Sequence, residues 1–162
     1  MKVEPHQSVI LLAEDREDDI LIMRKAFAQT DLPSLLFVVR DGEQAIAYLQ
    51  GETPYGNRAE YPIPALLLLD LKMPRKSGFE VLAWIRQQSH LAALRVIVLT
   101  SSEATSDLNR AYELGANSFL AKPSEFQDMI QLIQFINGFW LQFNETLHAF
   151  PPGPSPRSDS LQ

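Results

Sequence analysis

The sequence predicts an α/β fold, a doubly wound parallel sheet of five strands with helices on both faces. Short apolar runs alternate five times with segments in which apolar residues recur at helical spacing. The first three runs are apolar throughout, as strands covered on both faces are. Polar residues follow several of these runs directly, at the edge where open parallel sheets bind ligands.

The predicted elements of the first half begin with Val9–Ala13, a short apolar run that indicates a buried strand. Apolar residues spaced by three and four positions predict a helix over Asp18–Gln29. A second strand is predicted over Leu35–Val39, and an amphipathic helix over Gly42–Leu49. Three prolines and two glycines in Gly51–Pro64 predict a loop, because both residue types interrupt regular structure.

The second half repeats this alternation and adds a long final helix. Short apolar runs again predict the strands, and apolar residues at helical spacing predict the helices. Gly115 follows one helix directly and is expected in the left-handed conformation that ends many helices. The predicted strands are Ala65–Leu69, Arg95–Leu99 and Ser118–Ala121, and the predicted helices are Gly78–Gln88, Ala104–Leu114 and Phe126–Phe150.

One domain accounts for the chain, whose 162 residues are 46% hydrophobic. Residues 1–8 are expected to be an N-terminal extension, and residues 9–150 the folded domain with its extended final helix. Residues 151–162 contain four prolines with serine and glycine, a composition that predicts a disordered tail.

Charge and composition disfavour several classes of function. The formal net charge is −6, without a run of Lys or Arg, whereas nucleic acids and anionic membranes require a basic surface. No apolar stretch is long enough to span a bilayer or to form the core of a signal peptide. The absence of cysteine excludes disulfides and fits a reducing compartment, so we expect a cytoplasmic protein.

Five residues at the predicted strand ends have the chemistry of a phosphoryl-transfer site. Glu14 and Asp15 follow the first strand, Asp70 the third, Thr100 the fourth and Lys122 the fifth. Crowded carboxylates favour a hard cation, and Mg²⁺ prefers oxygen ligands. Beside the cation, the Asp70 carboxylate is a candidate nucleophile toward a phosphoryl group. Lys122 and Thr100 would pair with the phosphoryl oxygens.

Each of these residues has an ordinary structural explanation when it is taken alone. An acidic pair or a single Asp after a strand is often a helix cap or a turn residue. Thr100 with Ser101 could cap the next helix, and Lys122 could be a surface lysine. We favour the functional interpretation because such residues recur at four strand ends.

The sequence resembles the receiver domain of bacterial response regulators from Val9 to about Trp140. The resemblance rests on several short motifs and on the spacing between them. It implies a receiver-like sheet with the strand order 2-1-3-4-5. The motifs are Glu14-Asp15, Leu69-Asp-Leu-Lys-Met-Pro74 with Gly78, Thr100-Ser101, Gly115-Ala116 and Lys122-Pro123.

The resemblance implies a role for each residue of the site. Asp70 would be the phosphoacceptor, Asp15 and Asp70 would bind Mg²⁺ directly, and Glu14 would act largely through water. The backbone carbonyl of Lys72 would supply a further ligand. Two residues depart from the commonest pattern, since Glu14 replaces the more frequent Asp and Lys72 places a cation two residues after the acceptor. There Lys72 could touch the phosphoryl group or hinder the hydrolytic water.

The resemblance also implies a conformational switch. Phosphorylation would draw Thr100 inward and let the aromatic Phe119 rotate inward, which would change the surface of the fourth helix, fifth strand and fifth helix. The Lys122–Pro123 bond would be cis, which an X–Pro bond permits at little cost. The alternative is that Phe119 is an ordinary core residue of its strand.

A closer resemblance is to single-domain regulators paired with bacterial phytochromes, especially the cyanobacterial ones. It rests on the long loop Gly51–Pro64, the segment Tyr112-Glu-Leu-Gly-Ala-Asn117 and the late Gly138-Phe-Trp140. It implies a light-sensing histidine kinase as the donor of the phosphoryl group. Because the proline-rich tail is too short for an output domain, we also expect a downstream protein target.

The final predicted helix has more apolar surface than one sheet can cover. Its apolar residues occupy about half of the circumference, whereas a core-facing helix needs a stripe of only ~100°. Excess apolar surface suggests a partner, and the family dimerises through this region, so we expect a homodimer. The alternative is that the last turn folds back onto the domain. The expected interface residues are Ile136, Phe139, Trp140, Phe143 and Leu147.

Two other functions fit the sequence less well. Phosphatases of the haloacid dehalogenase type also place a nucleophilic Asp at a strand end, but they need a second Asp where this chain has Lys72. A receiver that has lost its switching would lack the acceptor, a metal carboxylate or the lysine, all of which are present. We therefore expect a signalling protein that catalyses only its own phosphoryl transfer and slow autodephosphorylation.

Overall fold

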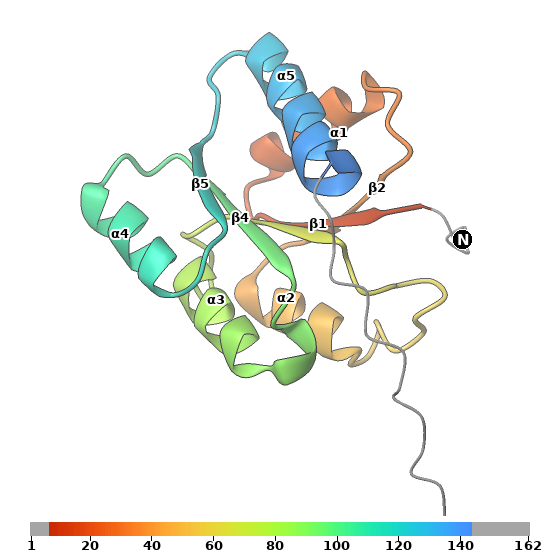
Figure 1. Cartoon of the computed structure of the whole chain (residues 1–162), viewed down its shortest axis with the longest axis vertical. Helices are drawn as coiled ribbons and strands as arrows, with labels where there is room; N and C mark the ends of the chain where they lie inside the picture. The colour runs from red at the N-terminus through yellow and green to blue at the C-terminus, as the bar shows by residue number, and fades with distance from the viewer. Residues whose placement is uncertain (1–6, 144–162) are drawn as a thin grey trace, which may run out of the picture.

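A parallel sheet of five strands lies at the centre of the structure, a computed structural model that describes residues 7–143 (Figure 1). The strand order is β2-β1-β3-β4-β5 and every neighbouring pair is parallel, which confirms the predicted fold class and order. The strands are β1 (Val9–Ala13), β2 (Leu35–Val39), β3 (Leu66–Leu69), β4 (Arg95–Thr100) and β5 (Ser118–Ala121).

Helices cover both faces of the sheet (Figure 1). One face carries α1 (Glu17–Ala28) and α5 (Phe126–Ile136), and the other carries α2 (Gly42–Gln50), α3 (Gly78–Gln87) and α4 (Thr105–Glu113). These bounds agree with the predicted ones to within one residue, except at the end of the last helix. The short 3₁₀ turn η1 (Ser89–Leu91), which the sequence did not predict, lies between α3 and β4.

The strands are mostly apolar because each side of the sheet has its own core. Leu11 and Leu69 belong to the core beneath α2 and α3, whereas Leu12 and Leu68 belong to the core beneath α1 and α5. All four side chains are almost completely buried. Burying one leucine contributes roughly 1.5–3 kcal/mol, so covering both faces accounts for the uninterrupted apolar runs of the sequence.

Side-chain caps and a glycine fix the ends of the helices. Asp41 precedes α2 and accepts a hydrogen bond from the Gln44 amide at 2.8 Å. Ser77 and Glu80 form a capping box at the start of α3, where the Ser77 amide lies 2.7 Å from the Glu80 carboxylate. Gly115 follows α4 with a φ of 97°, the left-handed conformation predicted for it.

The loop between α2 and β3 is held by an aromatic cluster and one arginine. The rings of Tyr48, Tyr55 and Tyr61 form pairs whose centroids lie between 5.1 and 6.0 Å apart. The Arg58 guanidinium donates hydrogen bonds to the carbonyl oxygens of Tyr48, Leu49 and Tyr61. Two of these bonds reach carbonyl oxygens in the last turn of α2 and the third reaches the loop itself, so the arginine packs the predicted loop against the domain.

The final helix changes its winding after Ile136, which corrects the predicted uninterrupted helix Phe126–Phe150. α5 ends there, and η2 (Asn137–Phe143) continues in a wider, π-type winding. Asn137 is buried, and its side-chain oxygen accepts a hydrogen bond from the Ser34 hydroxyl at 3.0 Å. A buried amide needs such a partner, so this bond ties the change of winding to the residue before β2.

Some predictions concern residues that the structure does not describe. These are most of the N-terminal extension 1–8, the end of the final helix with Leu147, and the tail 151–162. Between residues 7 and 143, no helix has the length and apolar character needed to pass through a bilayer.

Asp41 is expected to stabilise the fold both as the cap of α2 and through an ion pair with Arg75, whose Nε lies 2.8 Å away. Burial alone would raise the pKa of Asp41, but the hydrogen bonds from Gln44 and Arg75 outweigh it and hold the pKa below its ordinary value. Asp41→Ala should lower the free energy of unfolding by about 1–2 kcal/mol. Asp41→Asn should cost less, because an amide oxygen can still cap the helix.

Urea unfolding at several pH values tests this expectation. A carboxyl whose pKa is lower in the folded state gives stability that is present above its unfolded pKa and lost as the pH falls through its folded pKa. The difference in the free energy of unfolding between the parent and Asp41→Asn should therefore be largest near neutral pH and shrink in acid. A difference that stays constant down to the lowest pH at which the parent remains folded would contradict it.

Candidate functional site

The register of the sheet aligns the ends of four strands along one edge. Ala13 of β1 pairs with Leu69 of β3, and Thr100 of β4 pairs with Ala121 of β5. Because parallel strands end on the same side, the residues at and after these positions enter the same space. The structure thereby brings together all five predicted residues, Glu14, Asp15, Asp70, Thr100 and Lys122.

Three carboxylates at this edge are close enough to share one metal ion. Glu14, Asp15 and Asp70 each offer an oxygen, and these oxygens lie within 4.8 Å of one another. Glu14 and Asp70 are buried, and Asp15 Oδ1 is buried without a hydrogen-bond partner in the described part of the chain. An unpartnered carboxylate oxygen is costly in the interior, and a divalent cation with oxygen ligands would satisfy it. The donor set therefore fits the predicted cation.

Burial makes the charged forms of two of these carboxylates unfavourable. Desolvation raises the pKa of Glu14, although a hydrogen bond from Lys122 opposes it. Desolvation also raises the pKa of Asp70. The charge of Lys122 and the hydrogen bonds from the Leu71 amide, at 2.9 Å, and from the Thr100 hydroxyl oppose this rise. A bound cation would act in the opposite direction, because it favours the charged form.

Lys122 lies at the centre of the site and is shared by three carboxylates. Its Nζ atom lies 2.5 Å from Glu14, 3.0 Å from Asp19 and 3.6 Å from Asp70. Burial by itself lowers the pKa of Lys122, but the hydrogen bonds and charges of these carboxylates outweigh it and leave the pKa raised. Sequence reasoning missed Asp19, because it lies in the acidic first turn of α1 and does not follow a strand.

The loop after β3 folds back tightly onto Asp70. The Gly78 amide donates a hydrogen bond to the Leu71 carbonyl oxygen at 2.9 Å. A Cβ atom at Gly78 would lie 2.2 Å from the Asp70 carbonyl oxygen, so only glycine fits this close approach. Lys72 lies exposed in the same loop, and its role as a carbonyl ligand stays a prediction.

The two features predicted for the switch have different outcomes. The prediction of a cis Lys122–Pro123 bond is wrong, since the cis peptide bond in the described residues is Thr53–Pro54. An X–Pro bond prefers trans by only about 0.5–1 kcal/mol, so the surroundings decide each case. Phe119 is half-buried against the core, beside a cavity of about 300 Å³ that the loop before α4 also lines. Its rotation stays a prediction.

An aromatic patch, formed by Phe135, Phe139 and Trp140, lies on α5 and η2. Phe135 and Phe139 are exposed, whereas Trp140 is partly buried against the core beneath α1 and α5. Phe135 and Phe139 are 61% and 51% exposed, and their rings stack with centroids 5.9 Å apart. Trp140 packs edge-on against Phe139 at 5.1 Å. Sequence reasoning missed Phe135, because it lies outside the apolar sector of an ideal helix.

The residues expected at a dimer interface are found in different places. Phe139 and Trp140 belong to the aromatic patch. Ile136 lies instead in the core of its own domain, so its side chain is not available to a second copy in this structure. The side chains of Phe143 and Leu147 are not described.

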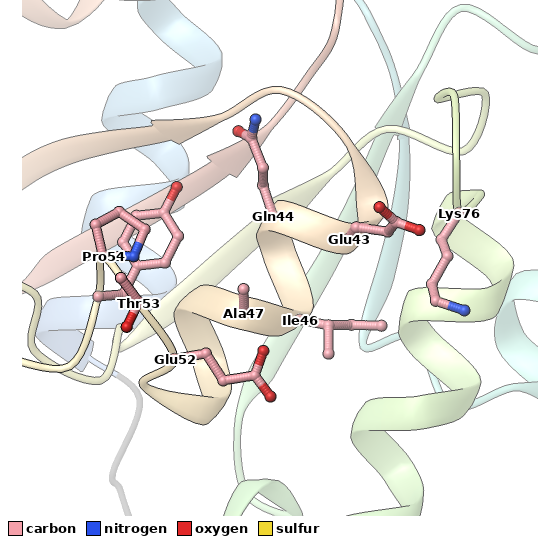
Figure 2. Close-up of a pocket in the computed structure, with 9 residues that line it drawn as sticks. Glu43, Gln44, Ile46, Ala47, Glu52, Thr53, Pro54 and Lys76 are labelled. Carbon is pink, nitrogen blue, oxygen red and sulfur yellow. The ribbon is translucent and has the colours of Figure 1, made fainter.

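A wider cavity of about 600 Å³ lies away from the carboxylates, between α2 and the loop that follows it. Figure 2 shows Thr53 and Pro54 on one side of this cavity and Lys76 on the other. Its lining mixes apolar side chains with single charged ones and does not include the strand-end acids. The residues predicted for phosphoryl transfer therefore lie at the strand ends and not in this cavity.

Comparison with known proteins gives one consistent result. The family model described as the response regulator receiver domain matches residues 10–134. Response regulator Rcp1 of Synechocystis sp. is 39% identical over 134 residues, which cover 83% of this chain and 89% of Rcp1. The structure of the phosphorylated cyanobacterial phytochrome response regulator RcpA is similar with a TM-score of 0.78 at 35% identity, covering 86% of this chain and 97% of RcpA. The structure of the Mn²⁺-bound form of Rcp1 is similar with a TM-score of 0.76 at 39% identity, covering 88% of this chain and 99% of Rcp1.

The carboxylate cluster predicts that a divalent cation stabilises the folded protein. MgCl₂ or MnCl₂ should raise the midpoint of urea unfolding. An ion that binds only the native state adds roughly 2.7 kcal/mol to the free energy of unfolding when its concentration is 100 times its dissociation constant. Asp15→Asn should weaken cation binding roughly tenfold or more in isothermal titration calorimetry. Without added cation, this variant should be at least as stable as the parent, because it removes one of three crowded charges.

Asp18→Asn provides the matched control, because Asp18 is exposed on α1 and lies outside the cluster. It should keep the cation affinity of the parent. Lowering the pH should weaken cation binding. The loss should begin at a higher pH than it would for a site of exposed carboxylates, because burial raises the pKa of Glu14 and Asp70. Equal cation affinity in the parent and Asp15→Asn would rule out this site.

Proposed function

Because this chain belongs to the response regulator receiver domain family, we propose that it accepts a phosphoryl group on Asp70 from a sensor histidine kinase, with Mg²⁺ as its cofactor. The single observation that carries this proposal is the surroundings of Asp70. Its carboxylate lies beside those of Glu14 and Asp15, with Lys122 and Thr100 close to it. This arrangement supplies a nucleophile, a cation site and two groups for the phosphoryl oxygens.

The proposed step is an in-line transfer between two side chains. An oxygen of Asp70 forms a bond to phosphorus while the bond from phosphorus to the imidazole nitrogen of the kinase breaks, and that nitrogen keeps the electron pair. The Lys122 ammonium group and the Thr100 hydroxyl would balance the charge on the phosphoryl oxygens. Bound Mg²⁺ supplies further positive charge for the same oxygens.

Glu14, Asp15 and Asp70 would hold the cation, with the backbone carbonyl of Lys72 as a further ligand. Mg²⁺ usually keeps several waters and needs only one or two direct carboxylates. Glu14, which accepts a hydrogen bond from Lys122, would act through such a water. The Mn²⁺-bound form of Rcp1 supports a divalent cation in this kind of site.

Phosphorylation would change the surface around β5. The Lys122 amide donates a hydrogen bond to the Thr100 carbonyl oxygen at 2.8 Å, so the two residues that would touch the phosphoryl group are joined across neighbouring strands. Phe119 lies on β5, which ends directly before Lys122. Its side chain borders the cavity at the start of α4. Thr100 and Phe119 would move inward together and alter the α4–β5–α5 face, which a downstream protein would bind.

The proposed donor is a phytochrome-type histidine kinase. RcpA is a cyanobacterial phytochrome response regulator, and this chain covers 97% of it at 35% identity. The exchange would take place in the cytoplasm, the compartment expected from the sequence. Receiver domains are signalling modules, and the phosphatase alternative would need an acid where the exposed Lys72 lies.

The aromatic patch of Phe135, Phe139 and Trp140 supports a homodimer. Two stacked phenylalanine rings that are more than half exposed are a costly surface for a monomer. Aromatic side chains are enriched at interface cores, and one patch can serve both copies across a two-fold axis.

Acetyl phosphate with Mg²⁺ should add one phosphoryl group to the protein, measured by intact-protein mass spectrometry. Asp70→Asn should abolish the label, because an amide is not a nucleophile toward phosphorus. Asp18→Asn removes an exposed carboxylate and should keep the label. Retention of the label in Asp70→Asn would overturn the assignment.

Phe139→Glu should convert the dimer to a monomer in light scattering, because it places a charge at the centre of the aromatic patch. Ile63→Glu is the control, since Ile63 is 47% exposed but lies in the loop before β3. That variant should remain dimeric. A parent that is monomeric at high concentration, with and without acetyl phosphate, would contradict the proposed interface.

A further inference from the structure

Asp19 contacts the lysine of the site without belonging to the carboxylate cluster. Its Oδ2 accepts a hydrogen bond from Lys122 Nζ at 3.0 Å, whereas Asp70 Oδ2 lies 3.6 Å from the same atom. The carboxylates grouped closely enough for a metal ion are Glu14, Asp15 and Asp70. The Asp19 charge is instead directed to Lys122 and, at 3.7 Å, to the exposed Arg16.

The contact between Asp19 and Lys122 is partly enclosed. Their side chains are 30% and 12% exposed, and the small cavity beside them is also lined by Leu12, Met23 and Met129. A charge pair in apolar surroundings is screened less than a pair at the surface. The pair is thus strong enough to direct the ammonium group and remains open to exchange with another anion.

We propose that Asp19 is a positioning residue that holds the Lys122 ammonium group away from Asp70 until a phosphoryl group is attached. This inference rests on the proposed function. Glu14 and Asp19 take the two short contacts of the lysine, and Asp70 takes the long one. A cation bound to the cluster would draw on the charge of Glu14 and leave Asp19 as the main partner of Lys122.

A phosphoryl group on Asp70 would compete with Asp19 for the lysine. It carries about −1.5 to −2 charges and three strong acceptor oxygens, so Lys122 would exchange one contact for the other. Breaking the contact between Asp19 and Lys122 costs free energy, and this cost makes the phosphorylated state less stable. Asp19 therefore limits how tightly the phosphorylated site closes.

Beryllofluoride, a phosphoryl mimic that binds to an aspartate oxygen, tests this inference on the full chain. Its affinity at saturating Mg²⁺ is measured by fluorine NMR of the bound species. Asp19→Asn should lower the half-saturating concentration roughly three- to tenfold, the effect of a partly exposed charged contact. Asp18→Asn removes the same charge from the next residue, which is exposed, and should leave the affinity near that of the parent.

Lys122→Ala separates an effect through the lysine from an effect of charge alone. By itself it should weaken the binding of beryllofluoride. Added to Lys122→Ala, Asp19→Asn should have little further effect, because the contact that it removes is already gone. Asp19→Asn should also keep a cation affinity close to that of the parent, since Asp19 lies outside the cluster.

Two results would overturn the positioning role. One is an unchanged or weaker affinity for beryllofluoride in Asp19→Asn while the parent binds it. The other is a gain in affinity from Asp19→Asn that is equally large in the Lys122→Ala background, which would mean that Asp19 acts only as a general repulsive charge. Failure of the parent itself to bind beryllofluoride would instead overturn the proposed function, on which this inference rests.

Discussion

Three carboxylates crowded at one edge of the sheet are the constraint on which the rest of the structure depends. Glu14, Asp15 and Asp70 repel one another, and the first and last are buried, so the cluster costs free energy that packing elsewhere must offset. Lys122 offsets part of this cost from within the chain, because it is within 3.6 Å of two of them. A site that is unfavourable without a ligand responds strongly to any added positive charge.

The sheet supplies the rigidity that keeps these charges together. Its central strands β1, β3 and β4 are buried on both faces, so their ends cannot separate without opening a core. Gly78 lets the loop after β3 close directly on the Asp70 backbone, and Arg75 ties that loop to the cap of α2 through Asp41. The repulsion at the site is therefore retained by the fold and not relieved by movement of the backbone.

The fold and the centre of the site could be predicted because both rest on local patterns. Each apolar run predicts a strand, and Glu14, Asp70 and Lys122 each follow one directly. The role of Asp19 could not be predicted, since it depends on a side chain 103 positions away and nothing in its own turn separates it from Asp18. The change of winding at Asn137 is also not local, because its buried amide is paired with a distant hydroxyl. Register and direction, which decide such contacts, are properties of the assembled sheet.

The shared lysine also determines how a charge at Asp70 would reach the surface. Lys122 is followed by Pro123 and then by α5, whose far end is held by Ile136 in the core and by the bond between Asn137 and Ser34. A movement that starts at Lys122 would therefore shift β5 and the beginning of α5 more than the aromatic patch at its end. On this geometry the proposed dimer contact at the patch would stay the same in both states. The face of α4 and β5 would change instead, since Phe119 and the loop before α4 border a cavity next to the moving strand. The proposed dimer would then keep a constant strength, and the affinity of the proposed partner-binding face would change with phosphorylation.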